Sequence, residues 1–152
     1  MFDFVYDILN NYALICSMLG WLIASLAKVV ILLIREKRLD FRKIFASGGM
    51  PSSHSATVSA LAAAVAQTDG LRSTSFAISF MFAFIVMYDA SGVRRAAGEQ
   101  ARILNHLINN LSEHKPVYVK KNLKELIGHT PLEVVVGALL GILIALVVPS
   151  GG

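Results

Sequence analysis

Apolar residues are gathered into long blocks along this chain rather than spread at regular helical spacing. Three blocks, at 12–34, 73–88 and 131–148, are nearly uncharged, and the first of them contains only Lys28. At about 1.5 Å of rise per residue, a helix of about 20 residues crosses the roughly 30 Å hydrocarbon core of a bilayer. The pattern therefore predicts three membrane-spanning helices.

Two further segments have a different pattern. Residues 56–68 form a shorter block rich in Ala and Ser, which suits a helix packed closely against other helices rather than facing lipid. Residues 96–112 carry apolar side chains at helical spacing among charged ones, which indicates an amphipathic helix at the membrane interface. We predict an all-α fold: a small integral membrane helical bundle of about four transmembrane helices plus that interfacial helix, in a single domain over residues 1–152.

The composition agrees with a membrane protein. Of 152 residues, 55% are hydrophobic and only 16% are charged. Cys16 is the only cysteine, so it cannot form an intramolecular disulfide, and we expect it to pack as a small apolar residue. The first ten residues contain acidic groups and no Lys or Arg, which argues against a cleavable signal peptide.

The basic residues predict the orientation in the membrane. They concentrate between the first and second spans and between the third and fourth, whereas Arg72 is alone in the other loop. The positive-inside rule places the two basic loops in the cytoplasm, and we expect a multi-pass protein of a bacterial cell membrane. Topology and anionic lipid explain the net charge of +4 better than nucleic acid does, because no nucleic-acid-binding module is recognisable. The residues assigned to the basic loops are Arg35, Lys37, Arg38, Arg42 and Lys43, then Arg94, Arg95, Arg102, Lys115, Lys120, Lys121 and Lys124.

Ionisable residues also converge on this face from the ends of the four spans. Such groups are costly at membrane depth unless they are paired or functional. A cluster that contains several cations is a candidate site for an anion. Its members are Lys28 and Arg35 late in the first span, His54 at the start of the second, Asp89, Arg94 and Arg95 at the end of the third, and His129 and Glu133 at the start of the fourth.

The stretch GGMPSSHSA, residues 48–56, is an unusual polar entrance to an apolar helix. Its glycines allow backbone conformations closed to other residues, Pro51 suits a helix start, and the hydroxyls of Ser52 and Ser53 lie near the free amides of a first turn. Such a turn can cradle an anion. From the residues alone, His54 either donates a proton to a phosphate ester oxygen or caps the helix at the interface.

Three ordered motifs carry a resemblance to a known family. Pro51-Ser52-Ser53-His54 resembles the Pro-Ser-Gly-His signature of the type-2 phosphatidic acid phosphatase superfamily, which includes bacterial acid phosphatases and vanadium haloperoxidases. Together with YDASGVRRAAGEQA at 88–101 and GHTPLEVVVG at 128–137, it resembles the divergent branch of that superfamily. The resemblance extends from about Lys28 to the last helix.

The resemblance implies a role for each matching residue. Lys28 and Arg35 have the spacing of the first, phosphate-binding motif, although Glu36 stands where proline is expected. His54 matches the general acid for the leaving group. His129 matches the nucleophilic histidine, and Glu133 takes the place of the aspartate four residues further on.

The front half of the third motif, a Ser-Arg pair, is missing, because Leu123 lies six residues before His129. Arg94 or Arg95 could supply the displaced guanidinium, and Asp89 could hold one of them in place. Amides near Ser52 and Ser53 would complete the phosphate contacts.

The implied activity is that of a membrane phosphatase. It would hydrolyse a lipid phosphate monoester or diphosphate through a phosphohistidine, with no metal and no cofactor, at a site facing the cytoplasm. Candidate substrates are phosphatidic acid, phosphatidylglycerol phosphate and polyprenyl diphosphates. The alternatives are a non-catalytic lipid- or phosphate-binding membrane protein that has lost part of the catalytic motif, and a structural or transport-associated bundle.

Several residues also have simpler explanations. Lys28 could snorkel to the interface, Arg94 and Arg95 could be ordinary charges flanking a span, and Thr130-Pro131-Leu132-Glu133 reads as a helix capping box. His106 and His114 are expected at the surface. The chain has no HExxH or CxxC motif typical of zinc sites. Gly137 and Gly141 form a GxxxG that permits close helix contact, within the chain or in a homodimer.

Overall fold

The computed structural model describes residues 2–37, 49–112 and 128–150. The side chain of Arg35 is not among the described ones, and Arg38, Arg42, Lys43, His114, Leu123 and the lysines of 113–127 lie outside the described residues. The described elements are all helices, which confirms the all-α prediction for this part of the chain. They are α1 (Phe2–Leu9), α2 (Tyr12–Glu36), α3 (Ser53–Thr68), α4 (Thr74–Ser91), α5 (Val93–Ser112) and α6 (Pro131–Val147).

Polar side chains define where the helices begin. The Asn11 side chain accepts the Leu14 N–H at the start of α2 (3.1 Å), and the Ser73 hydroxyl accepts the Phe76 N–H at the start of α4 (3.1 Å). At α3 the cap is Ser52, whose hydroxyl accepts the Ser55 N–H at 3.3 Å. Pro51 therefore precedes the cap, and its prediction as a helix-starting residue was wrong.

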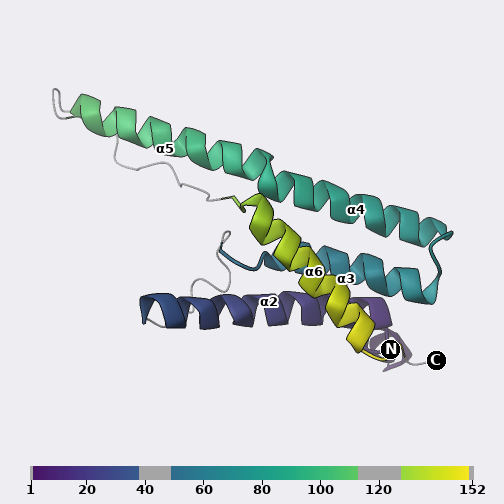
Figure 1. Cartoon of the computed structure of the whole chain (residues 1–152). Helices are drawn as coiled ribbons and strands as arrows, with labels where there is room; N and C mark the ends of the chain where they lie inside the picture. Colours follow the sequence, from purple (N-terminus) through teal and green to yellow (C-terminus); the bar gives the residue numbers. More distant parts are fainter. Residues whose placement is uncertain (1, 38–48, 113–127, 151–152) are drawn as a thin grey trace.

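Helix α3 lies at the centre of the bundle, in contact with α2, α4 and α6 (Figure 1). This position explains its composition, because small side chains allow three helices to approach it closely. The prediction that 56–68 forms a helix packed closely against other helices is confirmed, with the helix starting three residues earlier. Its buried residues are Ser53, Ser55, Ala56, Val58, Ser59, Ala60, Ala62 and Ala64.

Glycines bring α2 and α6 into contact with the backbone of α3. A Cβ on Gly20 of α2 would lie 2.9 Å from the Ala56 carbonyl oxygen, and a Cβ on Gly141 of α6 would collide with that same oxygen. A Cβ on Gly137 would collide with the carbonyl oxygen of Ser52. The close contact predicted for the GxxxG is thus made within one chain, and a homodimer stays a prediction.

The far end of the bundle is held by hydrogen bonds to the last turn of α6. The Tyr12 hydroxyl and the Gln67 side-chain amide both donate to the Ala145 carbonyl, at 2.6 and 2.9 Å. Cys16 is fully buried beside them, packed with Ala60, Ala64 and Ala145. The prediction that Cys16 is a small packing residue is confirmed.

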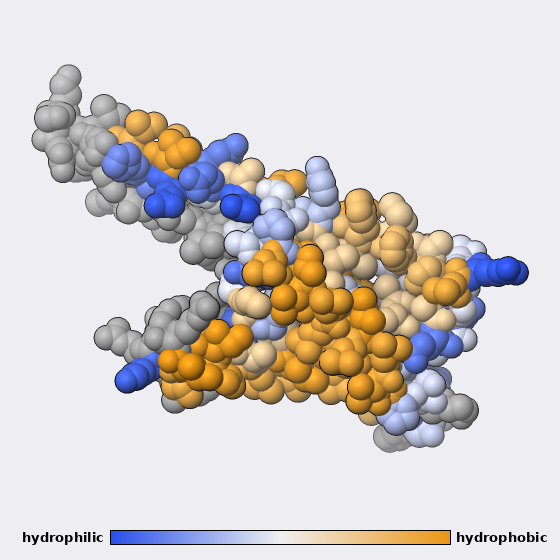
Figure 2. Space-filling model, viewed as in Figure 1, coloured by the Kyte–Doolittle hydropathy of each residue, from blue (hydrophilic) through white to orange (hydrophobic). Residues whose placement is uncertain are grey.

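Two helical stretches are long and apolar enough to cross a membrane: Tyr12–Ile34, and Thr74–Ile108, which joins α4 and α5. Helix α6 is apolar but shorter. Figure 2 shows a broad apolar face over α6 and the neighbouring part of α2. Exposed leucines of α6, among them Leu139, Leu143 and Leu146, contribute to the outer surface of the bundle.

Helix α5 follows α4 after Gly92 alone and continues in nearly the same direction (Figure 1). It begins at Val93, so the predicted boundary at 96 was three residues late. Of the described helices, α5 contacts only α4, and it exposes Ile103, Leu104 and Leu107. An interfacial location for this helix stays a prediction.

The contact between α6 and α3 yields a stability prediction. Replacing glycine by alanine inside a helix normally stabilises it by about 1 kcal/mol. In Gly141→Ala the added Cβ meets the backbone of Ala56, so we expect a loss of about 1–3 kcal/mol instead. The free energy of unfolding in detergent measures this change. Leu143→Ala, at an exposed position of the same helix, should change it by much less; a Gly141→Ala protein as stable as the parent would contradict the packing.

Candidate active site

His129 lies directly before α6, and its backbone joins two helices. Its N–H donates to the carbonyl of Ala90, near the end of α4, at 3.0 Å. The preceding Gly128 lies against the backbone of Arg95, where a Cβ would collide with the Arg95 amide nitrogen. The loop therefore needs a residue without a side chain there, and it places the imidazole in the interior, only 3% exposed.

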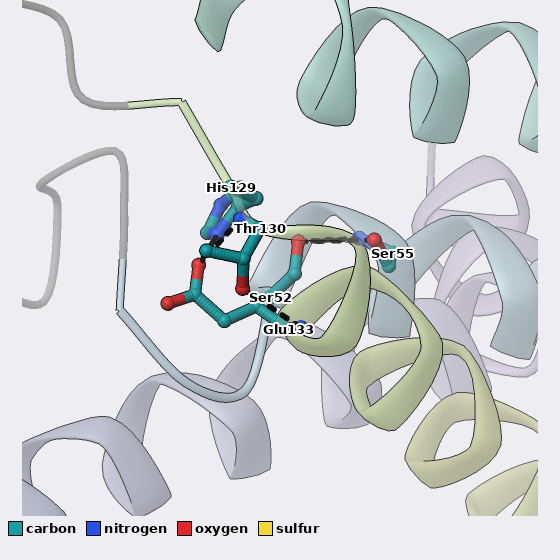
Figure 3. Close-up of polar contacts among 5 residues, drawn as sticks. All are labelled: Ser52, Ser55, His129, Thr130 and Glu133. Carbon is teal, nitrogen blue, oxygen red and sulfur yellow. Dashed lines mark hydrogen bonds and ion pairs between the residues drawn. The ribbon is translucent and has the colours of Figure 1, made fainter.

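Glu133 holds the ring of His129 and also caps α6 (Figure 3). One carboxylate oxygen, Oε2, lies 3.0 Å from His129 Nδ1 and accepts the Thr130 N–H at 3.1 Å. In return, the Thr130 hydroxyl accepts the Glu133 N–H at 3.3 Å. The capping box and the contact with His129, which the sequence presented as competing roles of Glu133, are present together.

This contact selects a tautomer of His129. When the Glu133 carboxylate is ionised, Nδ1 carries the hydrogen and donates it, so the lone pair of the neutral ring is on Nε2. Nε2 is buried and has no hydrogen-bond partner among the described residues. A carboxylate that orients one nitrogen and leaves the other unpaired is the arrangement expected of a nucleophilic or proton-transferring histidine.

Burial, more than the surrounding charges, favours the neutral form of His129. Burial lowers the pKa of His129, the contact with Glu133 opposes this effect, and the positive charges of Lys28 and Arg94 lower the pKa further. The ring is therefore neutral near pH 7. Lys28 and Arg94 are also close enough to act on one imidazole, although they come from different helices.

Lys28, in the second half of α2, is only 3% exposed, which contradicts the snorkelling alternative. Its charge interacts with Glu133, but Nζ has no hydrogen-bond partner among the described residues. Gly49, at a φ of 85°, covers its stem: a Cβ there would lie 3.5 Å from the Lys28 side chain. A buried ammonium without hydrogen bonds is costly unless something else supplies them, and an anion would do so.

A small pocket lies beside His129. It is lined by His54, Val86, Asp89, Ala90, Arg94, Gly128 and His129. The ring centroids of His54 and His129 are 6.2 Å apart, with His54 exposed at the rim and His129 buried. The two imidazoles therefore lie close enough to contact one bound group.

The arginines differ in their positions. Arg94 lines the pocket and its Nε donates to the Asp89 carboxylate at 2.7 Å, so Asp89 pairs with this arginine. Arg95 is exposed and is not among the residues that line the pocket. Of the two residues left open by the sequence, Arg94 has the geometry for a contact with a bound anion.

Ser52 connects the two helix starts that carry the histidines. Its N–H donates to the Glu133 carbonyl at 3.1 Å, and its hydroxyl accepts from the hydroxyl and the N–H of Ser55 (Figure 3). Both Ser52 and Ser53 are buried. The amide and the hydroxyl of Ser52 are thus engaged inside the protein, and a phosphate contact near Ser53 stays a prediction.

Sequence reasoning missed two residues of this region. Ser25 lies one helical turn before Lys28, and its hydroxyl is likewise buried with no partner among the described residues. Its spacing of three from Lys28 could have drawn attention to it. Gly128 could have been noticed from its position directly before His129. No group of three or more His, Cys, Asp and Glu residues that could hold a metal ion occurs within the described ranges.

Comparison with known proteins assigns this chain to a family. The model of the Divergent PAP2 family matches residues 9–144. The chain belongs to this family. Proteins similar to it include the uncharacterized membrane protein YuiD of Bacillus subtilis (strain 168), with 44% identity over 151 residues, 93% of this chain and 96% of YuiD. No solved structure matches the chain.

The environment of Lys28 predicts an unusual mutational effect. Replacing Lys28 by methionine keeps most of the volume and removes a buried charge, so Lys28→Met should raise the free energy of unfolding in detergent by about 1 kcal/mol or more. The matched control is Lys37→Met, at an exposed lysine just after the same helix, which should leave stability nearly unchanged. A Lys28→Met protein less stable than the parent would show that the ammonium is satisfied in the folded protein.

Proposed function

We propose that this protein is a membrane phosphatase that transfers the phosphoryl group of a lipid phosphate monoester or diphosphate to His129 and then to water. The observation that carries the proposal is that two of the three buried side-chain atoms without hydrogen-bond partners among the described residues are Lys28 Nζ and His129 Nε2. One is a cation and the other a candidate nucleophile. A phosphoryl group is a ligand that would satisfy both.

The proposal places the site in the membrane as follows. Helices α2, α3, α4 and α6 cross a bacterial cell membrane, with α3 shielded from lipid by the other three. The starts of α3 and α6 and the end of α4 face the cytoplasm, as the positive-inside rule requires. A phosphate head group enters from the inner leaflet while its hydrocarbon remains in lipid.

In the first step, the Nε2 lone pair of neutral His129 attacks phosphorus. The new N–P bond forms as the bond between phosphorus and the leaving oxygen breaks. Glu133, 3.0 Å from Nδ1, stabilises the positive charge that develops on the ring and fixes its orientation. The proposal thus rests on a contact made within the first turn of α6.

His54 acts on the other side of the phosphoryl group. The imidazolium form of His54, which the negative charge of a bound phosphate favours, gives a proton to the leaving alkoxide, or to the leaving phosphate when the substrate is a diphosphate. Neutral His54 then takes a proton from the water that attacks the phosphohistidine. Inorganic phosphate leaves and His129 regains its lone pair.

Lys28 and Arg94 stabilise the phosphoryl oxygens during both steps. The ammonium approaches from α2, inside the bundle, and the guanidinium from the junction of α4 and α5. Fixed positive charges in a site with little water favour the transition state more than they would in solution. In this arrangement Arg94 takes the place of the arginine missing before His129.

Release of phosphate tests the proposal. Purified protein in detergent should liberate inorganic phosphate from at least one of phosphatidic acid, phosphatidylglycerol phosphate and a polyprenyl diphosphate. His129→Ala should abolish release, and Glu133→Gln should slow it by about 100-fold or more, because the ring loses its orienting charge.

The control is His106→Ala, at an exposed histidine of α5, which should keep the parent rate. Binding of these lipids without turnover, or turnover that survives His129→Ala, would refute the enzymatic proposal. The first result would instead identify a phosphate-binding protein that has lost catalysis.

The pH dependence of the rate follows from the pKa of His129. The attacking form is neutral, so kcat/KM should fall as the pH drops through that pKa. Burial lowers the pKa, so this acid limb of the pH–rate profile should lie below the ordinary histidine value of about 6.5. Glu133 raises the pKa of His129, so Glu133→Gln should move the residual acid limb to still lower pH. A limb that moved to higher pH in this variant would contradict the assignment.

A further inference from the structure

A second cavity lies between α3, α4 and α6, and it is almost entirely apolar. Its volume is about 330 Å³. The lining consists of alanines, phenylalanines, Met87, Ile142 and a single hydroxyl, that of Ser59. This hydroxyl already donates to the sulfur of Met87 at 3.8 Å, so the cavity presents no free polar group among its lining side chains.

The cavity lies further along two of the helices that line the phosphate pocket, α3 and α4. Val86 of α4 lines the pocket and the adjacent Met87 lines the cavity. On α3, His54 lines the pocket and Ser59 the cavity, a separation of roughly 7.5 Å along the helix axis. A hydrocarbon chain that follows α3 and α4 away from His129 would reach this apolar space.

The length of the cavity matches one leaflet of a bilayer. On α4 its lining extends from Met87 to Phe76, roughly 16 Å along the axis. Half of the hydrocarbon core of a membrane measures about 15 Å. Phe80 and Phe84 are about half exposed along this length, so the cavity is a groove open to its surroundings rather than a closed core.

Small side chains keep the groove open. Ala62 and Ala63 of α3 and Ala138 of α6 line it, and larger residues at these positions would fill it. Close packing elsewhere in α3 shows that neighbouring helices can approach this helix when nothing lies between them. Helices α4 and α6 contact each other much less than each contacts α3.

We infer that this groove binds one hydrocarbon chain of the lipid whose phosphate occupies the His54–His129 pocket. The inference rests on the proposed function and narrows its substrate to a lipid phosphate with a chain long enough to reach Phe76. Ala138 is then a specificity-determining residue. The groove selects for the chain, and the pocket for the phosphate.

Photo-crosslinking tests where the chain lies. The probe is a lysophosphatidic acid with a diazirine near the methyl end of its chain, added to the full-length protein in detergent, with adducts mapped by mass spectrometry. Adducts should concentrate on Phe76, Phe80 and Ile142, at the end of the groove distant from the histidines. A monoacylglycerol with the same chain, which lacks the phosphate, should label these residues several-fold less.

Two matched variants test the groove by size. Ala138→Leu puts a larger side chain into it, whereas Ala77→Leu makes the same change at an exposed position of α4 outside it. Ala138→Leu should raise KM for a long-chain lipid phosphate by about ten-fold or more and reduce groove labelling accordingly. Its KM for a short, water-soluble phosphate monoester should not change, and this also shows that the variant is folded. Ala77→Leu should resemble the parent protein.

The outcomes separate the two proposals. Groove labelling without any phosphate release, in the parent protein, would refute the enzymatic proposal and leave the groove intact. Three results, each obtained alongside phosphate release, would overturn the groove. They are adducts scattered over exposed residues such as Leu143, equal labelling by the neutral lipid, and the same KM in both leucine variants. Adducts that require a second copy of the chain would also overturn it, because the groove would then be a dimer contact.

Discussion

The structure depends on the close contact between the backbones of α3 and α6. Gly137 and Gly141 present no side chain, so Ser52 and Ala56 lie directly against α6, and the Ser52 N–H reaches the carbonyl of Glu133. This hydrogen bond joins the helix start that carries His54 to the helix start that carries His129. The relative position of the two imidazoles follows from a contact between small residues outside the pocket.

A second constraint is electrostatic. Lys28 and His129 are both buried. The carboxylate of Glu133 already contacts the imidazole ring of His129 and accepts the Thr130 N–H at the α6 cap. One carboxylate cannot also supply every hydrogen bond that an ammonium needs. We propose that an anion completes the site, and the apolar groove beside it favours an anion attached to hydrocarbon.

The helices and several site residues could be predicted from the sequence because their signals are local. Apolar blocks indicate α2, α4 and α6, and the Thr130–Glu133 spacing indicates the capping box. The burial of Lys28 could not be predicted, since it depends on a segment distant in the sequence, in which Gly49 lies against the lysine stem. The choice between Arg94 and Arg95 was also beyond the sequence, because adjacent residues on a helix point in directions about 100° apart.

The central claim is that His129 Nε2 becomes covalently bonded to phosphorus. Rapid quenching of the protein with lipid phosphate at alkaline pH, followed by mass spectrometry of its peptides, tests this most directly. The account predicts an acid-labile phosphate on His129 of the parent protein and none in His129→Ala. Its occupancy should be higher in His54→Ala if this change slows hydrolysis of the phosphohistidine more than it slows the attack. Phosphate release by the parent protein with an unmodified His129, or with phosphate on a different side chain, would contradict it.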